Sequence, residues 1–233
     1  MGWIRKNVEY GNFLDLSPWR KIALGTWSTV GDPSVYGLLE LDVAPALRYL
    51  ENIQSTTGQR MTITHFVGKA LAETIKRHPS INSTLRWGRL YPRKTVDIFF
   101  QVASDKTGQD LTGLTIRQAS EKSVLELSRE IEKRVSKIRV DGDPDYKPMK
   151  SSMSLIPGIL VKPILNLTSF LMYSLNLWSP LLGIPRDTFG SAMVTNIGSL
   201  GLEIAFVPLF PHSRIPLLVS VAAIVEKPMA VAG

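Results

Sequence analysis

The segment Ser191-Ala192-Met193-Val194-Thr195-Asn196-Ile197-Gly198-Ser199-Leu200-Gly201 is the most informative part of this chain for both fold and chemistry. It begins with apolar residues, as a buried strand does, continues through Thr195 and Asn196, and enters a Gly-x-x-Gly turn. A hydroxyl at the end of a buried strand can donate a hydrogen bond to a developing negative charge. The alternative is a strand threonine that satisfies its own backbone. Thr195 and Asn196 are the candidate catalytic residues, although an asparagine at this place is more typical of a residue that shapes the turn.

Strand-like and helix-like patterns alternate around this segment. Apolar runs typical of strands occupy residues 35–42, 96–103, 111–116, 190–196 and 216–226. Apolar residues at helical spacing occupy residues 17–29, 44–53, 62–78 and 120–139. Long helices between strands indicate an α/β (α+β) fold with a mixed central sheet flanked by helices. We therefore expect one domain over residues 1–233.

Residues 153–184 are unusually apolar, and Lys162 is their only charged residue. The run 164–184 is long enough for a membrane span, but Asn, Thr, Ser and Pro residues interrupt it and Pro157 and Pro163 break its start. Shorter apolar helices, buried against the domain, a partner subunit or a bilayer surface, fit better. Residues 142–186 are thus interpreted as an apolar helical insertion within the domain, with peripheral membrane contact through 153–184 as one of its roles.

The composition excludes several classes of site. The chain has no cysteine, which removes disulfides, thiolate metal sites and a cysteine nucleophile. His65, His78 and His212 are far apart in sequence and none has a second ligand at helical spacing, so no metal is expected. The N-terminus lacks the apolar run of a signal peptide, and a cytoplasmic location is the simplest expectation.

The formal net charge is +7, and one basic group stands out. Its members surround Trp87 and Tyr91 and are Arg86, Arg89, Arg93 and Lys94. Basic residues mixed with aromatic ones can bind single-stranded nucleic acid. No RNP, KH or zinc signature accompanies them, which favours a helix end and a strand edge facing water over a nucleic-acid site.

Six segments follow one another in a specific order: residues 16–21, 61–70, 78–82, 96–103, 113–119 and 195–198. They include Arg20-Lys21 near the start, His78-Pro79-Ser80-Ile81-Asn82 after a helix, and Thr195-Asn196-Ile197-Gly198 at the end. This order resembles the catalytic domain of the acyltransferases of 2-oxo acid dehydrogenase complexes, within the dihydrolipoamide acyltransferase and chloramphenicol acetyltransferase-like superfamily.

The resemblance implies a specific chemistry. Members of that family transfer an acyl group between coenzyme A and a thiol, or a hydroxyl in the antibiotic-modifying branch. A histidine in a His-x-x-x-Asp-Gly motif acts as the general base, and a Ser or Thr at the position of Thr195 stabilises the oxyanion. The substrates meet in a channel between the subunits of a trimer. Arg20 stands where the family often has an arginine that pairs with the aspartate of the histidine motif.

The chain also departs from the family pattern. No His-x-x-x-Asp sequence occurs in it, and it stops about where the strand that carries this motif should begin. We expect either a C-terminally incomplete domain or a member without the base, and we expect Arg20 to lack a carboxylate partner in this chain. The resemblance implies a coenzyme A thioester as a substrate. The lipoyl signature is absent from this chain, so no covalent lipoyl group is expected in it. The alternative is a non-catalytic scaffold or membrane-associated interaction protein on the same fold.

Overall fold

The computed structural model describes residues 5–12, 14, 34–103, 111–141, 158–179, 186–209 and 211–228. Its centre is a four-stranded sheet in the order β5-β4-β7-β8. β4 (Ile98–Ala103) and β5 (Leu111–Ile116) form an antiparallel pair. β7 (Ala192–Asn196) lies parallel to β4 on one side and to β8 (Leu218–Val221) on the other. The expected mixed sheet is therefore confirmed.

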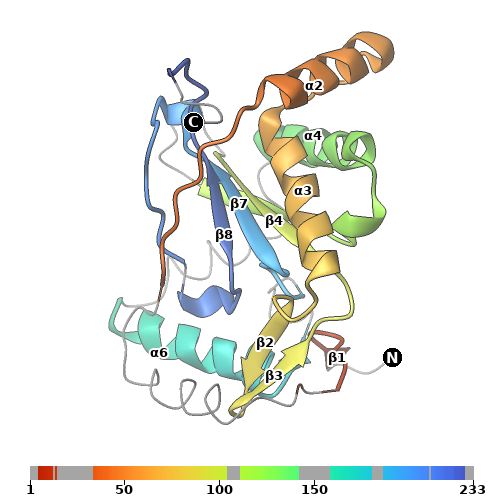
Figure 1. The fold of residues 1–233 in the computed structure, drawn as a ribbon. Coiled ribbons are helices and arrows are strands. Elements are labelled where there is room, and N and C mark those ends of the chain that lie inside the picture. Colours follow the sequence, from red (N-terminus) through yellow and green to blue (C-terminus); the bar gives the residue numbers. More distant parts are fainter. Residues whose placement is uncertain are drawn as a thin grey trace.

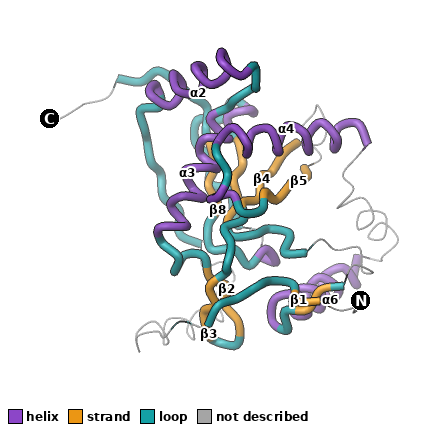
Figure 2. The backbone as a smooth tube through the Cα atoms, turned by 90° about the vertical axis from the view of Figure 1, so that its right-hand side faces the viewer, coloured by secondary structure: helices purple, strands orange, loops and turns teal. Residues whose placement is uncertain are grey.

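Helices α3 (Ile63–Arg77) and α4 (Val124–Asp141) cover one face of this sheet (Figure 1). The main core lies between them and the sheet, and its fully buried side chains include Ile75, Phe100 and Leu127. Figure 2 shows the same layering from the side, with α2 (Ala44–Thr57) beyond the end of the sheet.

The two covering helices begin where their capping residues allow. The Thr62 side chain accepts a hydrogen bond from the His65 N–H, and α3 starts at Ile63, directly after this cap. Ser123 and Glu126 form a reciprocal capping box: the Ser123 hydroxyl accepts from the Glu126 N–H, and the Glu126 carboxylate accepts from the Ser123 N–H. This box explains why α4 begins at Val124, four residues later than the start of the helical pattern at residue 120.

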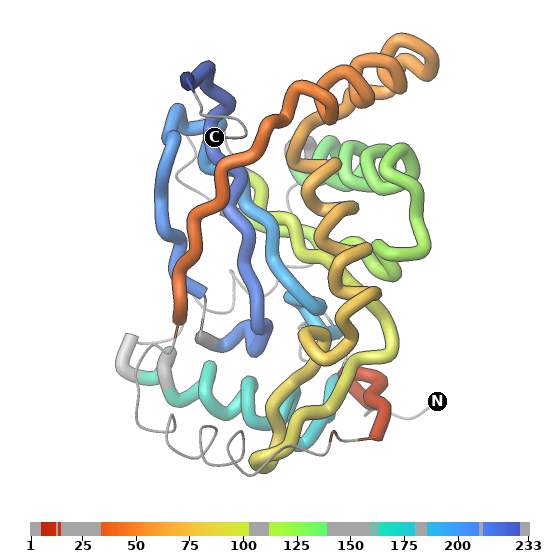
Figure 3. The backbone as a smooth tube through the Cα atoms, viewed as in Figure 1, coloured from red at the N-terminus to blue at the C-terminus, as the bar shows by residue number. Residues whose placement is uncertain are grey.

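The other face of the sheet is covered by irregular chain. Phe99, Met193 and Ile215 form a second buried cluster there, and Phe189, Leu209 and Leu218 pack against it. Residues 34–43 run beside residues 202–209 as an exposed extended chain (Figure 3), with the rings of Tyr36 and Phe206 in edge contact at 5.4 Å. The strand expected over 35–42 is wrong, because within the described residues this segment joins no sheet.

The end of the molecule opposite α2 holds α6 (Gly158–Ser169), a π-helical turn (Phe170–Ser174) and the hairpin of β2 (Ser83–Arg86) and β3 (Arg89–Pro92) (Figures 1 and 2). Two short strands, β1 (Arg5–Lys6) and β6 (Leu177–Trp178), pair antiparallel beside them. Among the described residues, no helix has the length and apolar character needed to cross a bilayer.

Gly68 sets the distance between α3 and the sheet. A Cβ atom at this position would lie 2.2 Å from the Phe100 ring, which is buried in the core. We expect Gly68→Ala to destabilise the fold by roughly 1–3 kcal/mol through overpacking, although alanine is the better helix former by about 1 kcal/mol. Urea denaturation measures the change. Gly37→Ala, where a Cβ meets nothing within 4 Å, is the control and should be neutral.

Candidate active site

Thr195 lies near the carboxyl end of β7, where the strand has passed its pairing with β4. The pairing of β7 with β4 ends at Val194, whereas its pairing with β8 continues, with Thr195 opposite Ser220. Thr195 is 8% exposed, and its hydroxyl makes no hydrogen bond within the described part of the chain. A threonine with a purely structural role would use this hydroxyl to bond its own backbone. The Thr195 hydroxyl makes no such bond to a described backbone group.

Strand alternation fixes the direction of the Thr195 side chain. Ala192 and Val194 belong to the core beneath α3 and α4, whereas Met193 belongs to the cluster on the opposite face. Thr195 shares the face of Met193, because successive side chains of a strand point to opposite sides. The hydroxyl thus faces the side of the sheet that no described helix covers.

Asn196 ties the strand end to α3. Its Nδ2 donates to the Thr64 hydroxyl over 2.7 Å, and its Oδ1 accepts from the Ser199 N–H over 3.0 Å. The Ser199 hydroxyl donates in turn to the Asn196 carbonyl over 2.9 Å. With both ends of its amide engaged, Asn196 holds the turn and positions Thr195. Its predicted place among residues that act on the substrate stays a prediction.

Gly198 lets the chain turn tightly against β8. A Cβ there would lie 2.6 Å from the Ala222 carbonyl oxygen, so no side chain fits without moving the backbone. Gly201 ends the turn with φ +75°, a conformation that glycine adopts readily. The two glycines of the Gly-x-x-Gly turn thus shape the chain that follows Thr195 and Asn196.

Sequence reasoning missed two hydroxyls near this strand end. Ser220 lies directly opposite Thr195 on β8 and, by strand alternation, on the same face of the sheet. Thr64 contacts Asn196 from the first turn of α3. The signal for Ser220 was its presence as the polar residue within the apolar run 215–224. Thr64 gave no such signal, because polar residues are common in the first turn of a helix.

None of the three histidines lies in the position expected of a general base. His65 is buried on the face of α3 that carries Gly68, Ala72 and Ile75 toward the sheet. Burial, together with the positive charge of Arg60, lowers the His65 pKa to about 4. His78 is the exposed C-cap of the same helix. The His212 Nε2 lies 3.1 Å from the Asn166 Oδ1, beside α6.

Two members of the basic group around Trp87, Arg86 and Arg93, make contacts within the protein. Arg93 is buried and forms an ion pair with Asp187. The Arg86 guanidinium lies 5.0 Å from the centre of the Tyr10 ring and 5.2 Å from that of Tyr91. Arg20, the other cation expected at a site, lies outside the described residues, so the expectation that it lacks a carboxylate partner stays open.

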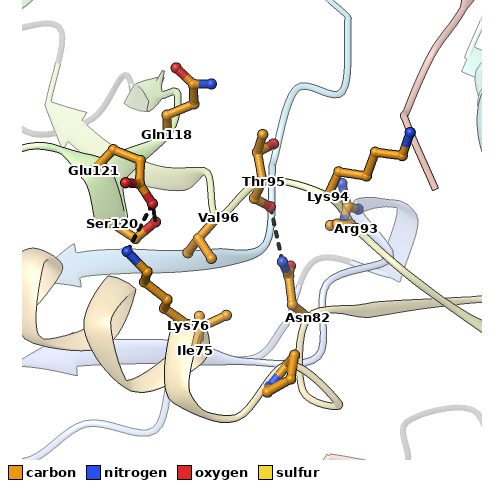
Figure 4. Close-up of a pocket in the computed structure, with 11 residues that line it drawn as sticks. Ile75, Lys76, Asn82, Arg93, Lys94, Thr95, Val96, Gln118, Ser120 and Glu121 are labelled. Carbon is orange, nitrogen blue, oxygen red and sulfur yellow. Dashed lines mark hydrogen bonds and ion pairs between the residues drawn. The ribbon is translucent and has the colours of Figure 1, made fainter. Parts of the chain in front are cut away.

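A cavity of about 380 Å³ opens at the other end of the sheet (Figure 4). Across it, Lys76 and Glu121 form an ion pair of 3.0 Å, and the Asn82 Nδ2 donates to the Thr95 carbonyl over 2.9 Å. Its walls come from residues just before β4 and just after β5. Because β4 and β7 are parallel, this is the end where β7 begins, so the cavity is separate from Thr195. Within the described residues, no group of acidic, histidine or cysteine side chains could hold a metal ion.

The fold and the strand end together define a class: an α/β domain with a mixed sheet whose central parallel strand ends in Thr-Asn-x-Gly. The family model of 2-oxoacid dehydrogenases acyltransferase (catalytic domain) matches residues 26–142, half of the chain. The chain belongs to this acyltransferase family. The matched range ends before β7, so the role of Thr195 does not follow from it.

Relatives agree with this membership. The lipoamide acyltransferase component of the branched-chain alpha-keto acid dehydrogenase complex of Bacillus subtilis (strain 168) is 26% identical over 111 residues, 46% of this chain and 26% of that protein. This chain thus spans about a quarter of that relative's length in the match.

Solved structures share the fold. A probable dihydrolipoamide acetyltransferase from Listeria monocytogenes 4b F2365 has a TM-score of 0.59 and 19% identity, over 95% of this chain and 79% of that one. The cubic core of a pyruvate dehydrogenase multienzyme complex has a TM-score of 0.59 and 18% identity, and the match covers 95% of this chain and 76% of that one. The mixed α/β fold expected from the sequence is therefore shared with these acyltransferase catalytic cores.

The lowered pKa of His65 makes stability depend on pH. The unfolded chain binds a proton on this ring below about pH 6.5, whereas the folded chain does so only near pH 4. The free energy of unfolding should therefore fall as the pH drops from about 6.5 to about 4, by up to roughly 3 kcal/mol at about 1.4 kcal/mol per pH unit. Urea denaturation at several pH values measures this slope.

His65→Leu should flatten the His65 contribution to that slope, because the titrating group is gone. His78→Gln, at an exposed position of the same helix, is the control and should keep the wild-type slope. An unchanged slope in His65→Leu would show that other groups set the acid sensitivity.

Proposed function

We propose that this domain transfers an acyl group from a coenzyme A thioester to a thiol, with the Thr195 hydroxyl stabilising the oxyanion. The single observation that carries the proposal is the Thr195 hydroxyl itself. It lies at the fixed carboxyl end of β7, nearly buried, with no hydrogen-bond partner in the described part of the chain. Family membership supports the reaction type.

The chemistry needs a donor at this kind of position. A thiolate attacks the thioester carbonyl carbon, the carbonyl oxygen becomes an oxyanion, and collapse of the tetrahedral intermediate expels coenzyme A thiolate. A preorganised donor about 3 Å from the oxyanion accelerates both steps. The Asn196 bond to Thr64 and the Gly198 contact with Ala222 hold the strand end still, which is the preorganisation required.

The general base is left unassigned. His65 points into the core toward the sheet, and its pKa of about 4 makes it a weak base at neutral pH. The sequence given has no His-x-x-x-Asp motif. A hydroxyl in place of a thiol as acceptor and the cytoplasmic location remain predictions.

The role of Thr195 can be tested without the base. Near about pH 9 a simple thiol with a pKa of about 8.5 is mostly thiolate, so its attack needs no proton acceptor. Acetyl transfer from acetyl-coenzyme A to dihydrolipoamide at this pH should then report the oxyanion donor. We expect Thr195→Ala to lower the enzymatic rate by about 10²–10³, the usual effect of losing one such donor.

Thr195→Ser is the matched control, because it keeps the hydroxyl and should stay within about tenfold of the wild type. Coenzyme A binding, measured by calorimetry, should be similar in all three proteins. Equal rates for Thr195→Ala and the wild type, both above the uncatalysed reaction, would remove the oxyanion role.

A non-catalytic scaffold is the second candidate function. The observation that favours it is the missing His-x-x-x-Asp motif in the sequence given. The same assay separates the two functions. A scaffold predicts no transfer above the uncatalysed thiolate reaction for any of these proteins.

We also propose that the chain assembles as a homotrimer. Large apolar side chains are exposed along 34–43 and the neighbouring segment 202–206, including Val35 at 90%, Leu39 at 76% and Phe206 at 57%. A contiguous surface of this kind is typical of an interface between subunits. The structural relative that forms a cubic core supports assembly of this fold.

The assembly can be measured directly by light scattering. The wild type should have the mass of three 25.9 kDa chains. Leu39→Glu should shift it toward the mass of one chain, because a charge would be buried without a partner. Glu51→Gln, on the exposed surface of α2, should not change the mass. A monomeric wild type would contradict the proposal.

Contact with a membrane through residues 153–184 is a separate candidate role. In the described part of this segment Leu160, Leu167 and Phe170 are exposed on and beside α6. This surface lies at the end of the molecule away from Thr195 (Figure 1).

A further inference from the structure

Helix α6 and the tip of the β2–β3 hairpin form one exposed apolar surface. On the helix side Leu160, Pro163, Leu167 and Phe170 recur at helical spacing and are all exposed. On the hairpin side Trp87 is 64% exposed, and its ring meets that of Phe170 edge-on at 6.0 Å. These five residues are called the α6–hairpin surface.

The α6–hairpin surface is held in place from within. The Trp87 Nε1 and the Arg86 Nη2 both donate to the Ser174 carbonyl, over 3.0 and 2.9 Å. The Asn7 Nδ2 donates to the Met172 carbonyl over 3.1 Å, and both groups are buried. These contacts fix which side of the helical segment faces the body of the protein and which side faces outward.

The hairpin tip projects because of its turn. Trp87 has φ 50° and Gly88 has φ 71°, the two positive values of a type I′ hairpin turn. A tryptophan in this conformation is strained, since the left-handed region favours glycine and asparagine. The fold thus presents an indole outward at a position where a polar residue would meet less strain.

The hairpin beside this surface is positively charged. Residues 80–96 contain Arg86, Arg89, Arg93 and Lys94 and no Asp or Glu. Arg93 is neutralised by Asp187 in the interior, while Arg89 and Lys94 are exposed. Glu9, an exposed carboxylate, lies 3.9 Å from the Arg186 guanidinium. An apolar stripe with an aromatic edge and surrounding cations matches the interface of an anionic bilayer.

We propose that the α6–hairpin surface docks the protein onto an anionic lipid bilayer. Leu160, Leu167, Phe170 and Trp87 would enter the boundary between headgroups and acyl chains, and the surrounding cations would contact lipid phosphate and carboxylate groups. A two-fold contact with a second copy of the chain fits less well, because it would bring two positive surfaces together. The proposal specifies the lipid class for the candidate membrane role and does not depend on acyl transfer.

Vesicle co-sedimentation of the full chain tests the docking. Vesicles of phosphatidylcholine with phosphatidylserine should sediment the wild type, and vesicles of phosphatidylcholine alone should sediment it more weakly. Leu167→Glu should weaken binding by about tenfold or more, since an apolar contact is lost and a negative charge approaches anionic lipid. Leu167→Met keeps the apolar contact and should bind as the wild type does.

The electrostatic part has its own pair of variants. Arg89→Gln should weaken binding to the anionic vesicles about fivefold, the usual contribution of one cation near such a surface. Arg48→Gln removes the same charge from α2 and should have little effect, because α2 lies at the opposite end of the molecule (Figure 2). Raising the salt concentration should weaken binding of the wild type.

Fluorescence quenching by brominated lipid locates the contact independently of any destabilised variant. Quenching of the wild-type tryptophan emission should fall in Trp87→Phe, which keeps an aromatic ring at the tip. The proposal is overturned if no vesicle sediments the wild type, or if Leu167→Glu binds as tightly as Leu167→Met. A change of oligomer mass in Leu167→Glu with unchanged vesicle binding would identify a subunit interface instead. The outcome of the acetyl-transfer assay on Thr195 is independent of these results, so the two proposals can fail separately.

Discussion

The pairing of β7 on both of its edges is the constraint on which the rest of the structure depends. β4 binds the first part of the strand and β8 binds the last part, in parallel on both sides. Thr195 and Asn196 extend past the end of the β4 pairing, stay paired with β8, and direct their side chains to opposite faces of the sheet. One face supplies the anchor through Thr64 of α3, and the other supplies a hydroxyl without a described partner.

The same arrangement separates the molecule into two ends with different properties. The carboxyl end of β7 lies beside the start of α3 and carries the candidate chemistry. The other end holds the α6–hairpin surface, fastened by Asn7 and by the hairpin itself (Figure 1). A protein fixed to a lipid surface at the second end would keep the first end directed away from the bilayer. Docking and catalysis would then not compete for one surface.

Much of the fold could be predicted because its signals are local. The apolar faces of α3 and α4 and the strands β4 and β5 follow from side-chain patterns within a few residues. The strand predicted over 35–42 is wrong, because an apolar pattern in the sequence does not reveal whether a partner strand is present. The neighbourhood of Thr195 was only half predictable, since its contacts with Ser220 and the Asn196–Thr64 bond join residues far apart in the chain.

A crystal structure with a coenzyme A thioester analogue whose sulfur is replaced by a methylene group would test the central claim most directly. Such a ketone keeps the carbonyl oxygen and cannot transfer its acyl group. The account predicts this oxygen about 3 Å from the Thr195 Oγ1, on the face of the sheet that carries Met193. An analogue bound instead in the cavity between Lys76 and Asn82, or bound with its carbonyl turned away from β7, would contradict it.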